Sequence, residues 1–169
     1  NNSFSGSLST ITENMYQKVL FLSTYSELND ALSRRSKEDI TAETLIKNKQ
    51  ITKVIDALIT DMGYNYEIYT SNENPIIEYE TLKGCKSYRV IAVCEIDSKD
   101  KFSAQDINSL KWNFIEKDGV KYLSAVKKYG NLSGEYNVVQ ILYNMSTFEK
   151  MITTPIFDDA VIRLTDRDG

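Results

Sequence analysis

Aromatic side chains are the most suggestive residues in this chain, because the sequence holds eleven tyrosines and one tryptophan. A pocket for a polar organic molecule combines flat apolar surfaces with a few polar groups. Trp112, flanked by Lys111 and Asn113, and Tyr122, across a predicted hairpin turn, form the best cluster for one wall of such a pocket. The alternative is that they are ordinary core and half-exposed sheet residues, since aromatic side chains are frequent in strands.

An arginine beside a tyrosine is the second candidate for ligand binding. Arg89 carries a planar guanidinium that can hold a carboxylate or a phosphate through two parallel hydrogen bonds, and Tyr88 precedes it. The alternative is an exposed surface arginine. The predicted ligand-binding residues are therefore Tyr88, Arg89, Lys111, Trp112 and Tyr122.

Catalytic residues are not predicted. The chain has no histidine, which removes the commonest general base, the commonest metal ligand and any Ser-His or Cys-His pair. Glu95 and Asp97 could be imagined as the acid and base of a glycosidase, but neighbouring acids in polar turns are usually solvated charges. Asp166, Asp168 and Gly169 match part of a calcium loop whose third acidic position and closing Glu are absent. We predict neither an enzyme nor a bound metal or other cofactor.

Length and composition predict one globular domain, or one domain plus an appended helix. The chain has 169 residues, of which 41% are hydrophobic and 26% charged, as is typical of globular proteins. A net charge of -4 offers no basic surface, so we expect no nucleic-acid partner. No apolar run is long enough to span a membrane, and no signal-peptide pattern is present. The start at Asn1 and the turn signal that closes at Gly169 indicate a fragment of a larger protein.

Two cysteines, Cys85 and Cys94, are too few for a structural zinc site. They form either a disulfide or two buried thiols. We favour the thiols, because a buried free cysteine packs as a small hydrophobic residue.

Two helices are predicted ahead of the strands. From Ser5 to about Arg35 apolar residues recur every three or four positions, which predicts one continuous helix with an apolar stripe from Leu8 to Leu32. Part of this helix is expected to project as a stalk. The stripe could form a dimer seam or pack on the domain's own sheet, and we expect both, with packing on the sheet in the larger share. Thr41 is the predicted N-cap of a second helix, with Gly63 as its C-cap glycine. The apolar face of that helix is predicted to hold Leu45, Ile51, Ile55, Leu58, Ile59 and Met62.

Strand patterns follow. The predicted strands are 64–70, 111–116, 120–129, 135–144 and 160–165. Asp118-Gly119 is a strong hairpin signal, and the nearly continuous apolar run of 135–144 indicates burial on both faces at the centre of the sheet. Ser146 and Glu149 fit a capping box that starts a short helix ending near Ile152. Residues 87–96 have the composition of a strand and the spacing of a helix, so their structure stays open.

This order of elements resembles the extracytoplasmic Cache domains of bacterial sensor histidine kinases, in particular the YesM-like group. The similar segments are LSTYSELNDAL in the first helix, GYNYEIYTSNENPI at 63–76, KWNF at 111–114, KYLSAVKKY at 121–129 and GEYNVVQILYNMSTFEKMI at 134–152. The resemblance covers nearly the whole chain and rests on element order and loose patterns. The spaced Tyr, Arg, Trp, Tyr and Asp signature of amino-acid-binding double Cache domains is not evident, so we transfer no amino-acid ligand.

The resemblance implies an α+β fold in which a long N-terminal helix packs on a PAS-like antiparallel sheet, as the distal module of a double Cache domain. Residues 1–40 would form the signalling helix, 41–154 the sensor module, and 155–169 the start of a membrane-proximal module. It also implies that 87–96 is helical and that the segment with Tyr88 and Arg89 closes over the sheet.

The function that the resemblance implies is ligand sensing by the extracytoplasmic part of a cell-membrane sensor histidine kinase. The expected partners are a small-molecule ligand or a solute-binding protein, and a second copy of the chain joined through the N-terminal helix. A chemoreceptor or a cyclic-dinucleotide enzyme could carry the same kind of domain. Alternatives of another class are a secreted carboxylate-dependent hydrolase and a cell-surface interaction domain without a small-molecule pocket.

Overall fold

The computed structural model describes residues 2–33, 41–60, 63–71, 77–82, 85–90, 102, 105–130 and 135–152, without the side chains of 2–4, 77–82, 85–90, 151 and 152. Its helices are α1 (Asn2–Thr24), α2 (Ser26–Leu32), α3 (Ala42–Ile59) and α5 (Met145–Ile152). Its strands are β1 (Tyr64–Thr70), β2 (Ile77–Leu82), β3 (Cys85–Val90), β4 (Leu110–Lys117), β5 (Val120–Gly130) and β6 (Tyr136–Asn144). The predicted strand 160–165 and the predicted module 155–169 lie outside the described residues.

Four strands form one antiparallel sheet in the order β1-β6-β5-β4, while β2 and β3 form a separate two-stranded hairpin. The long strand β6 lies between β1 and β5, and its side chains are buried from Asn137 to Tyr143. Burial on both faces explains why its sequence is a nearly continuous apolar run. The expected α+β fold with an antiparallel sheet, and the expected place of this strand at the sheet's centre, are confirmed.

The hairpin between β4 and β5 follows from its two turn residues. Asp118 and Gly119 have φ angles of 53° and 75°, the left-handed conformation that a tight hairpin turn requires at both positions. Lys117 therefore pairs with Val120, and this contact sets the register of the whole hairpin. The prediction from the Asp-Gly pair is confirmed.

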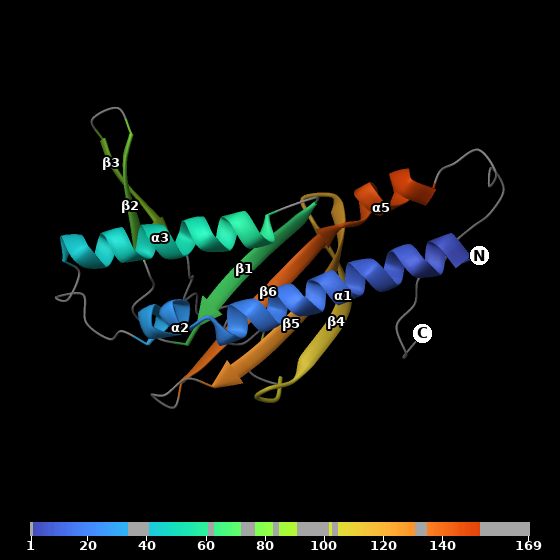
Figure 1. The fold of residues 1–169 in the computed structure, drawn as a ribbon, viewed down its shortest axis with the longest axis horizontal. Coiled ribbons are helices and arrows are strands. Elements are labelled where there is room, and N and C mark those ends of the chain that lie inside the picture. Colours follow the sequence, from blue (N-terminus) through green and yellow to red (C-terminus); the bar gives the residue numbers. More distant parts are fainter. Residues whose placement is uncertain are drawn as a thin grey trace.

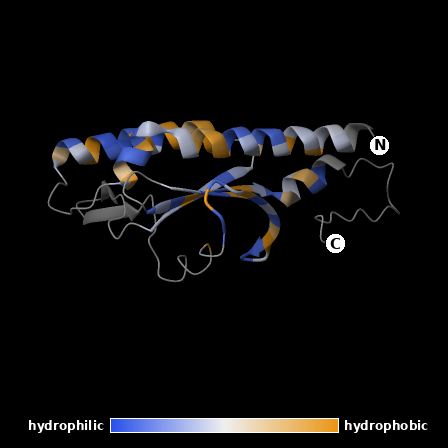
Figure 2. Cartoon of the chain, turned by 90° about the horizontal axis from the view of Figure 1, so that it is seen from below, coloured by the Kyte–Doolittle hydropathy of each residue, from blue (hydrophilic) through white to orange (hydrophobic). Residues whose placement is uncertain are grey.

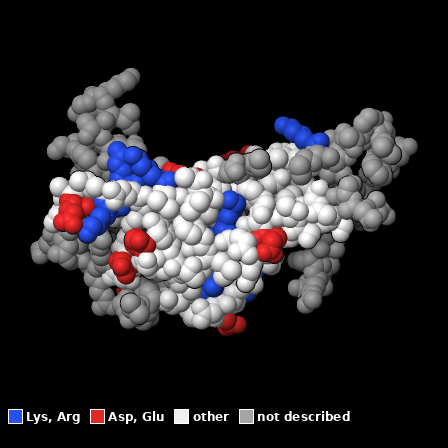
Figure 3. Space-filling view, viewed as in Figure 1, with Lys and Arg blue, Asp and Glu red and all other residues white. Residues whose placement is uncertain are grey.

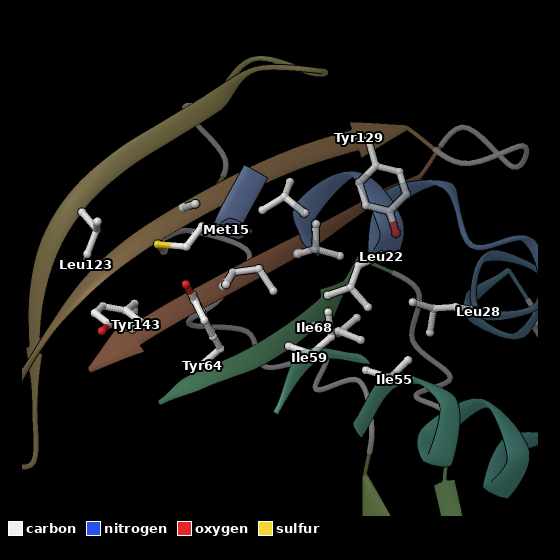
Figure 4. Close-up of a cluster of buried hydrophobic side chains, with 14 of the residues drawn as sticks. Met15, Leu22, Leu28, Ile55, Ile59, Tyr64, Ile68, Leu123, Tyr129 and Tyr143 are labelled. Atoms are coloured by element: carbon white, nitrogen blue, oxygen red, sulfur yellow. The ribbon is translucent and has the colours of Figure 1, made fainter. Parts of the chain in front are cut away.

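The helices α1 and α3 lie side by side against one face of the sheet, α1 across β5 and β6 and α3 nearer β1 (Figures 1 and 2). We call this the inner face, and the opposite one the outer face. Met15 and Leu22 of α1 are completely buried against it (Figure 4), and so is Val19. Burial of each such side chain contributes about 1.5–3 kcal/mol. From Ile11 onward the apolar stripe is thus part of the chain's own core rather than a dimer seam.

The predicted single helix is wrong at one point, because it breaks at Tyr25. This residue has an extended backbone (ψ 107°), so α1 ends at Thr24 and α2 begins at Ser26. The Asn29 side chain holds the break: its Nδ2 donates to Ser23 O at 3.1 Å, and its Oδ1 accepts from the Tyr129 hydroxyl at 2.9 Å. A tertiary contact therefore overrides a helical pattern that contains no Pro or Gly at this point.

The second helix begins as predicted and ends earlier. Thr41 Oγ1 accepts from the Thr44 amide at 3.2 Å, which confirms the N-cap. The C-cap is Thr60 and not Gly63, whose φ of +90° instead turns the chain into β1. The predicted apolar face is also wrong at Leu58, which is 52% exposed.

Two further secondary-structure elements differ from the sequence prediction. The strand β6 runs directly into α5, and Asn144 caps the helix by accepting from the Ser146 amide at 3.0 Å, so Ser146 is not the cap. Residues 85–90 form strand β3, paired with β2. The helix that the family resemblance implied for 87–96 is therefore wrong up to Val90, and 91–96 lie outside the described residues.

Candidate functional site

The outer face of the sheet carries a row of polar side chains at its centre. Alternation along β5 places Ser124 and Lys128 on this face, and the register places Gln140 of β6 there too, opposite Val126. We call Ser124, Lys128 and Gln140 the polar row, and each is at most 6% exposed. Buried polar groups are costly unless they are hydrogen-bonded, so this row is the candidate functional site.

One acceptor of the polar row has no donor among the residues that the structure describes. Gln140 Nε2 donates to Ser124 Oγ at 2.7 Å. Gln140 Oε1 is buried, and within the described part of the chain no donor reaches it. An unsatisfied buried carbonyl costs about 1–3 kcal/mol, an energy that a ligand with a hydroxyl or N–H donor would recover.

Lys128 continues the row toward the segment before β4. Its Nζ donates to Phe102 O at 3.1 Å and lies 4.2 Å from the centroid of the Tyr136 ring. Both contacts stabilise an ammonium in a place with little water. The buried amine thus joins the two central strands to residue 102.

Aromatic rings flank the polar row. Phe102 packs with Val126 and Val138 on the outer face, and its ring centroid is 5.2 Å from that of Tyr69. Gln105 is also buried here, and its Nε2 donates to Val126 O at 3.3 Å. The outer face therefore combines apolar rings with buried polar groups, as small-molecule sites do.

Glu67 supplies an acidic group at the edge of the candidate site. The Tyr69 hydroxyl donates to Glu67 Oε2 at 2.5 Å, and Lys117 forms an ion pair with the same carboxylate. The hydrogen bond to Glu67, followed by its negative charge, raises the pKa of Lys117 above its ordinary value. Because the Lys117 side chain is 54% exposed, the pair contributes little stability and mainly orients Glu67.

Ser124 is not placed as an activated nucleophile. The hydroxyl of Ser124 is hydrogen-bonded to an amide, which cannot act as a general base. Among the residues that the structure describes, no three His, Cys, Asp or Glu side chains lie close enough to hold a metal ion.

The predicted pocket wall is not one surface. Trp112 pairs with Ala125 and lies on the inner face, whereas Tyr122 pairs with Ile115 and lies on the outer face together with Lys111. Trp112 is 36% exposed, on the edge strand β4. Lys111 and Tyr122 thus share a face with the polar row, but Trp112 does not.

Tyr88 and Arg89 belong to strand β3, opposite Tyr79 and Glu78 of β2. Their side chains, like Cys94, Glu95 and Asp97, lie outside the described atoms. Their roles stay predictions.

Sequence reasoning missed the polar row. Its signal was present as Gln140 inside the apolar run VVQIL and as Ser124 and Lys128 four positions apart in one strand. A polar residue in the middle of a buried strand needs a partner, and this is the sign that could have identified the site.

No family model matches this chain, and no curated protein matches it either. None of the helices in the described ranges has the length and apolar character needed to cross a membrane.

Proposed function

We propose that this chain is the ligand-sensing extracytoplasmic domain of a membrane-bound sensor histidine kinase, and that its ligand binds the outer face over the polar row. The observation that carries the proposal is the buried Gln140 Oε1, which has no donor within the described residues. The α+β architecture, with helices on one face of an antiparallel sheet, supports a PAS-like sensor of the Cache type. The site favours a neutral polar molecule with a hydroxyl or amide donor for Gln140 and an apolar side for Tyr69.

The two faces of the central strands offer a route from ligand to helix. Ser124 belongs to the outer face, while its neighbours Leu123 and Ala125 belong to the core that α1 covers. Lys127 Nζ also donates to Ser23 Oγ near the end of α1, at 3.4 Å. A ligand that binds one arrangement of β5 more tightly than another would shift the position of α1, and this difference in affinity is all that signalling requires.

The experiment is a thermal-shift screen against sugars, amino acids, organic acids and peptides. A ligand present at about 100 times its Kd stabilises the folded state by about 2.7 kcal/mol. For a domain of this size we expect a rise in Tm of roughly 5–10 °C. The variant Ser124→Ala/Gln140→Met should lose this rise, because the polar contacts are gone.

The matched control is Gln50→Met, which makes the same Gln-to-Met change at an exposed position of α3, on the opposite side of the sheet from the polar row. It should keep the full ligand-induced shift. A ligand whose shift is the same in the double variant as in the unmodified chain would show that binding occurs elsewhere and would overturn the site. A library without any hit would refute direct sensing and favour recognition of a partner protein.

A second candidate is an interaction module, and two exposed aromatic residues favour it. Trp112 and Phe114 are 36% and 45% exposed on the same side of the edge strand β4. Exposed aromatic residues are frequent at the centres of protein interfaces. Trp112 is the one tryptophan of the sequence, so a blue shift of its fluorescence on titration with a solute-binding protein would support this function.

A further inference from the structure

The strand β4 forms an open edge of the sheet. Among the strands that the structure describes only β5 pairs with it, and the pairing runs without a bulge from Leu110 to Lys117. Residues 111–114 are all exposed, whereas β1, at the opposite edge, has one exposed residue, Asn65. An exposed edge strand without a bulge or a proline is a template for pairing with another strand. β4 is therefore the edge at which a further strand can add.

The hairpin turn determines which backbone groups of β4 face outward. In a two-residue hairpin the residues that flank the turn, here Lys117 and Val120, exchange two hydrogen bonds. Because hydrogen-bonded pairs alternate along an antiparallel ladder, every second residue before Lys117 also bonds to β5. The N–H and C=O groups of Trp112, Phe114 and Glu116 therefore point away from β5, toward the open edge.

Two aromatic side chains accompany these outward backbone groups. Trp112 and Phe114 are 36% and 45% exposed and lie on the inner face, beside the strands β5 and β6 that α1 covers. A neighbouring strand would remove both rings from water. The apolar stripe of α1 from Ile11 onward is packed in the chain's own core, so this stretch of α1 does not offer a second copy the same kind of surface.

The charges of the chain permit a second copy as the partner. One chain has a net charge of only -4, and Figure 3 shows acidic and basic side chains scattered over the helical side rather than gathered into a patch of one sign. Lys111 and Lys117 of β4 both lie on the outer face. Like charges destabilise a sheet where they lie directly opposite each other. The two lysines thus restrict the register of such a pair without excluding it.

We propose that β4 pairs antiparallel with β4 of a second copy about a two-fold axis at Asn113, which joins the two four-stranded sheets. Trp112 of each copy then lies opposite Phe114 of the other, and aromatic pairs of this kind stabilise neighbouring strands. Lys111 lies opposite Ile115, so no like charges meet. Because the axis is perpendicular to the sheet, the inner faces of both copies stay on the same side.

Other arrangements of the same edge fit less well. An axis at Phe114 would set Lys111 opposite Lys117 twice. An axis at Trp112 would pair a shorter stretch of the strand. Addition of β4 to β1 of another chain would build an open-ended series instead of a closed pair.

Pairing over residues 110–116 buries less surface than a stable dimer needs, so we expect a weak pair with a Kd on the order of 100 µM. The inference is independent of the ligand at the polar row. It assigns the two exposed rings to a second copy rather than to a solute-binding protein.

The first test is sedimentation equilibrium of the unmodified chain from about 10 µM to about 1 mM, a range that brackets the expected Kd. The average mass should rise from the 19.3 kDa of one chain toward twice that value and no further. Phe114→Lys should raise the Kd at least tenfold, because it replaces an apolar ring at the interface with a charge. The matched control is Ile46→Lys, a similar change at a position of α3 that is 59% exposed, and it should dimerise as the unmodified chain does.

The second test is disulfide cross-linking across the axis, with the linked peptides identified by mass spectrometry. In the proposed register the two copies of Asn113 form a pair without hydrogen bonds, whose Cα atoms are about 4.5 Å apart. Asn113→Cys should therefore cross-link under mild oxidation. The control Lys111→Cys lies on the same face, but its two copies are four residues out of step, about 13 Å along the strands, and should not cross-link.

Four outcomes overturn the proposal. The chain could sediment as a single copy at about 1 mM, or its mass could pass beyond that of a dimer. Phe114→Lys and Ile46→Lys could associate equally, which would place the contact at another surface. Finally, Asn113→Cys could cross-link no faster than Lys111→Cys, which would exclude the two-fold axis at Asn113.

Discussion

The hydrogen-bonded pair of Ser124 and Gln140 allows a direct test of whether buried polarity on the outer face serves binding or folding. In the variant Ser124→Ala/Gln140→Met, both partners become apolar, and methionine keeps the length and unbranched shape of glutamine. If the pair exists to hold the sheet together, its removal should destabilise the chain. If it exists to meet a ligand, the chain without ligand should not need it.

The magnitude follows from the two polar contacts. The variant loses one hydrogen bond, the 2.7 Å contact of Gln140 Nε2 with Ser124 Oγ, whose net contribution is about 0.5–1.5 kcal/mol. It also removes the buried Gln140 Oε1, which has no donor within the described ranges and whose burial costs about 1–3 kcal/mol. We expect the free energy of unfolding to rise by about 1 kcal/mol. Ser124→Ala alone should lower it by about 1–3 kcal/mol, because the amide then has two unpaired ends.

The assay is urea unfolding followed by far-ultraviolet circular dichroism, with the midpoint and slope fitted for each variant. The control Gln50→Met changes an exposed residue of α3 and should shift the free energy of unfolding by no more than about 0.5 kcal/mol. If the double variant loses more than about 1 kcal/mol, the polar row is structural and the reasoning that assigns it to a ligand is refuted.

Three further predictions concern the backbone and pH. Gly63→Ala should destabilise the folded chain by about 1–2 kcal/mol, because φ at this position is +90° and a Cβ would lie 3.1 Å from Thr147 Oγ1. Gly6→Ala should instead stabilise α1 by about 0.5–1 kcal/mol, because a Cβ there would meet nothing within 4 Å. Both changes are measured in the same urea assay. Thr41→Ala should cost about 1 kcal/mol through loss of the N-cap of α3, and an unchanged urea midpoint would contradict the cap's role. Burial raises the pKa of the Tyr129 phenol above its ordinary value of 10.0. The unfolded state therefore ionises first, and the stability from this group is complete below pH 10 and lost above it; Tyr129→Phe should flatten the fall in Tm measured from pH 9 to 11.

Local signals predicted the parts of the fold that local chemistry decides. The Asp118-Gly119 turn, the Thr41 cap and the buried strand 135–144 each depend on residues a few positions apart, and each was found where the sequence placed it. A local signal could also have corrected the prediction that Trp112 and Tyr122 lie on one surface. A two-residue turn pairs Lys117 with Val120, and counting from that pair places Trp112 and Tyr122 on opposite faces.

Long-range contacts decided what the sequence could not show. The break at Tyr25 depends on Asn29, whose partner Tyr129 is 100 residues away. The hydrogen bond of the Gln140 side chain likewise depends on Ser124, which lies on another strand. Neither contact has a periodic signal, so the apolar pattern alone predicted an unbroken helix and an uninterrupted apolar strand.

The short helix after the break has a kinetic consequence. With seven residues, α2 is far below the length at which a helix persists in water by itself. Its hydrogen bonds last only while Leu28 and Leu32 remain packed and Asn29 holds Ser23 and Tyr129. Amide protons of 29–33 will therefore exchange with solvent whenever α2 lifts from the sheet, even while β5 and β6 stay protected. The exchange rate of those few amides therefore reports how often the helical layer opens.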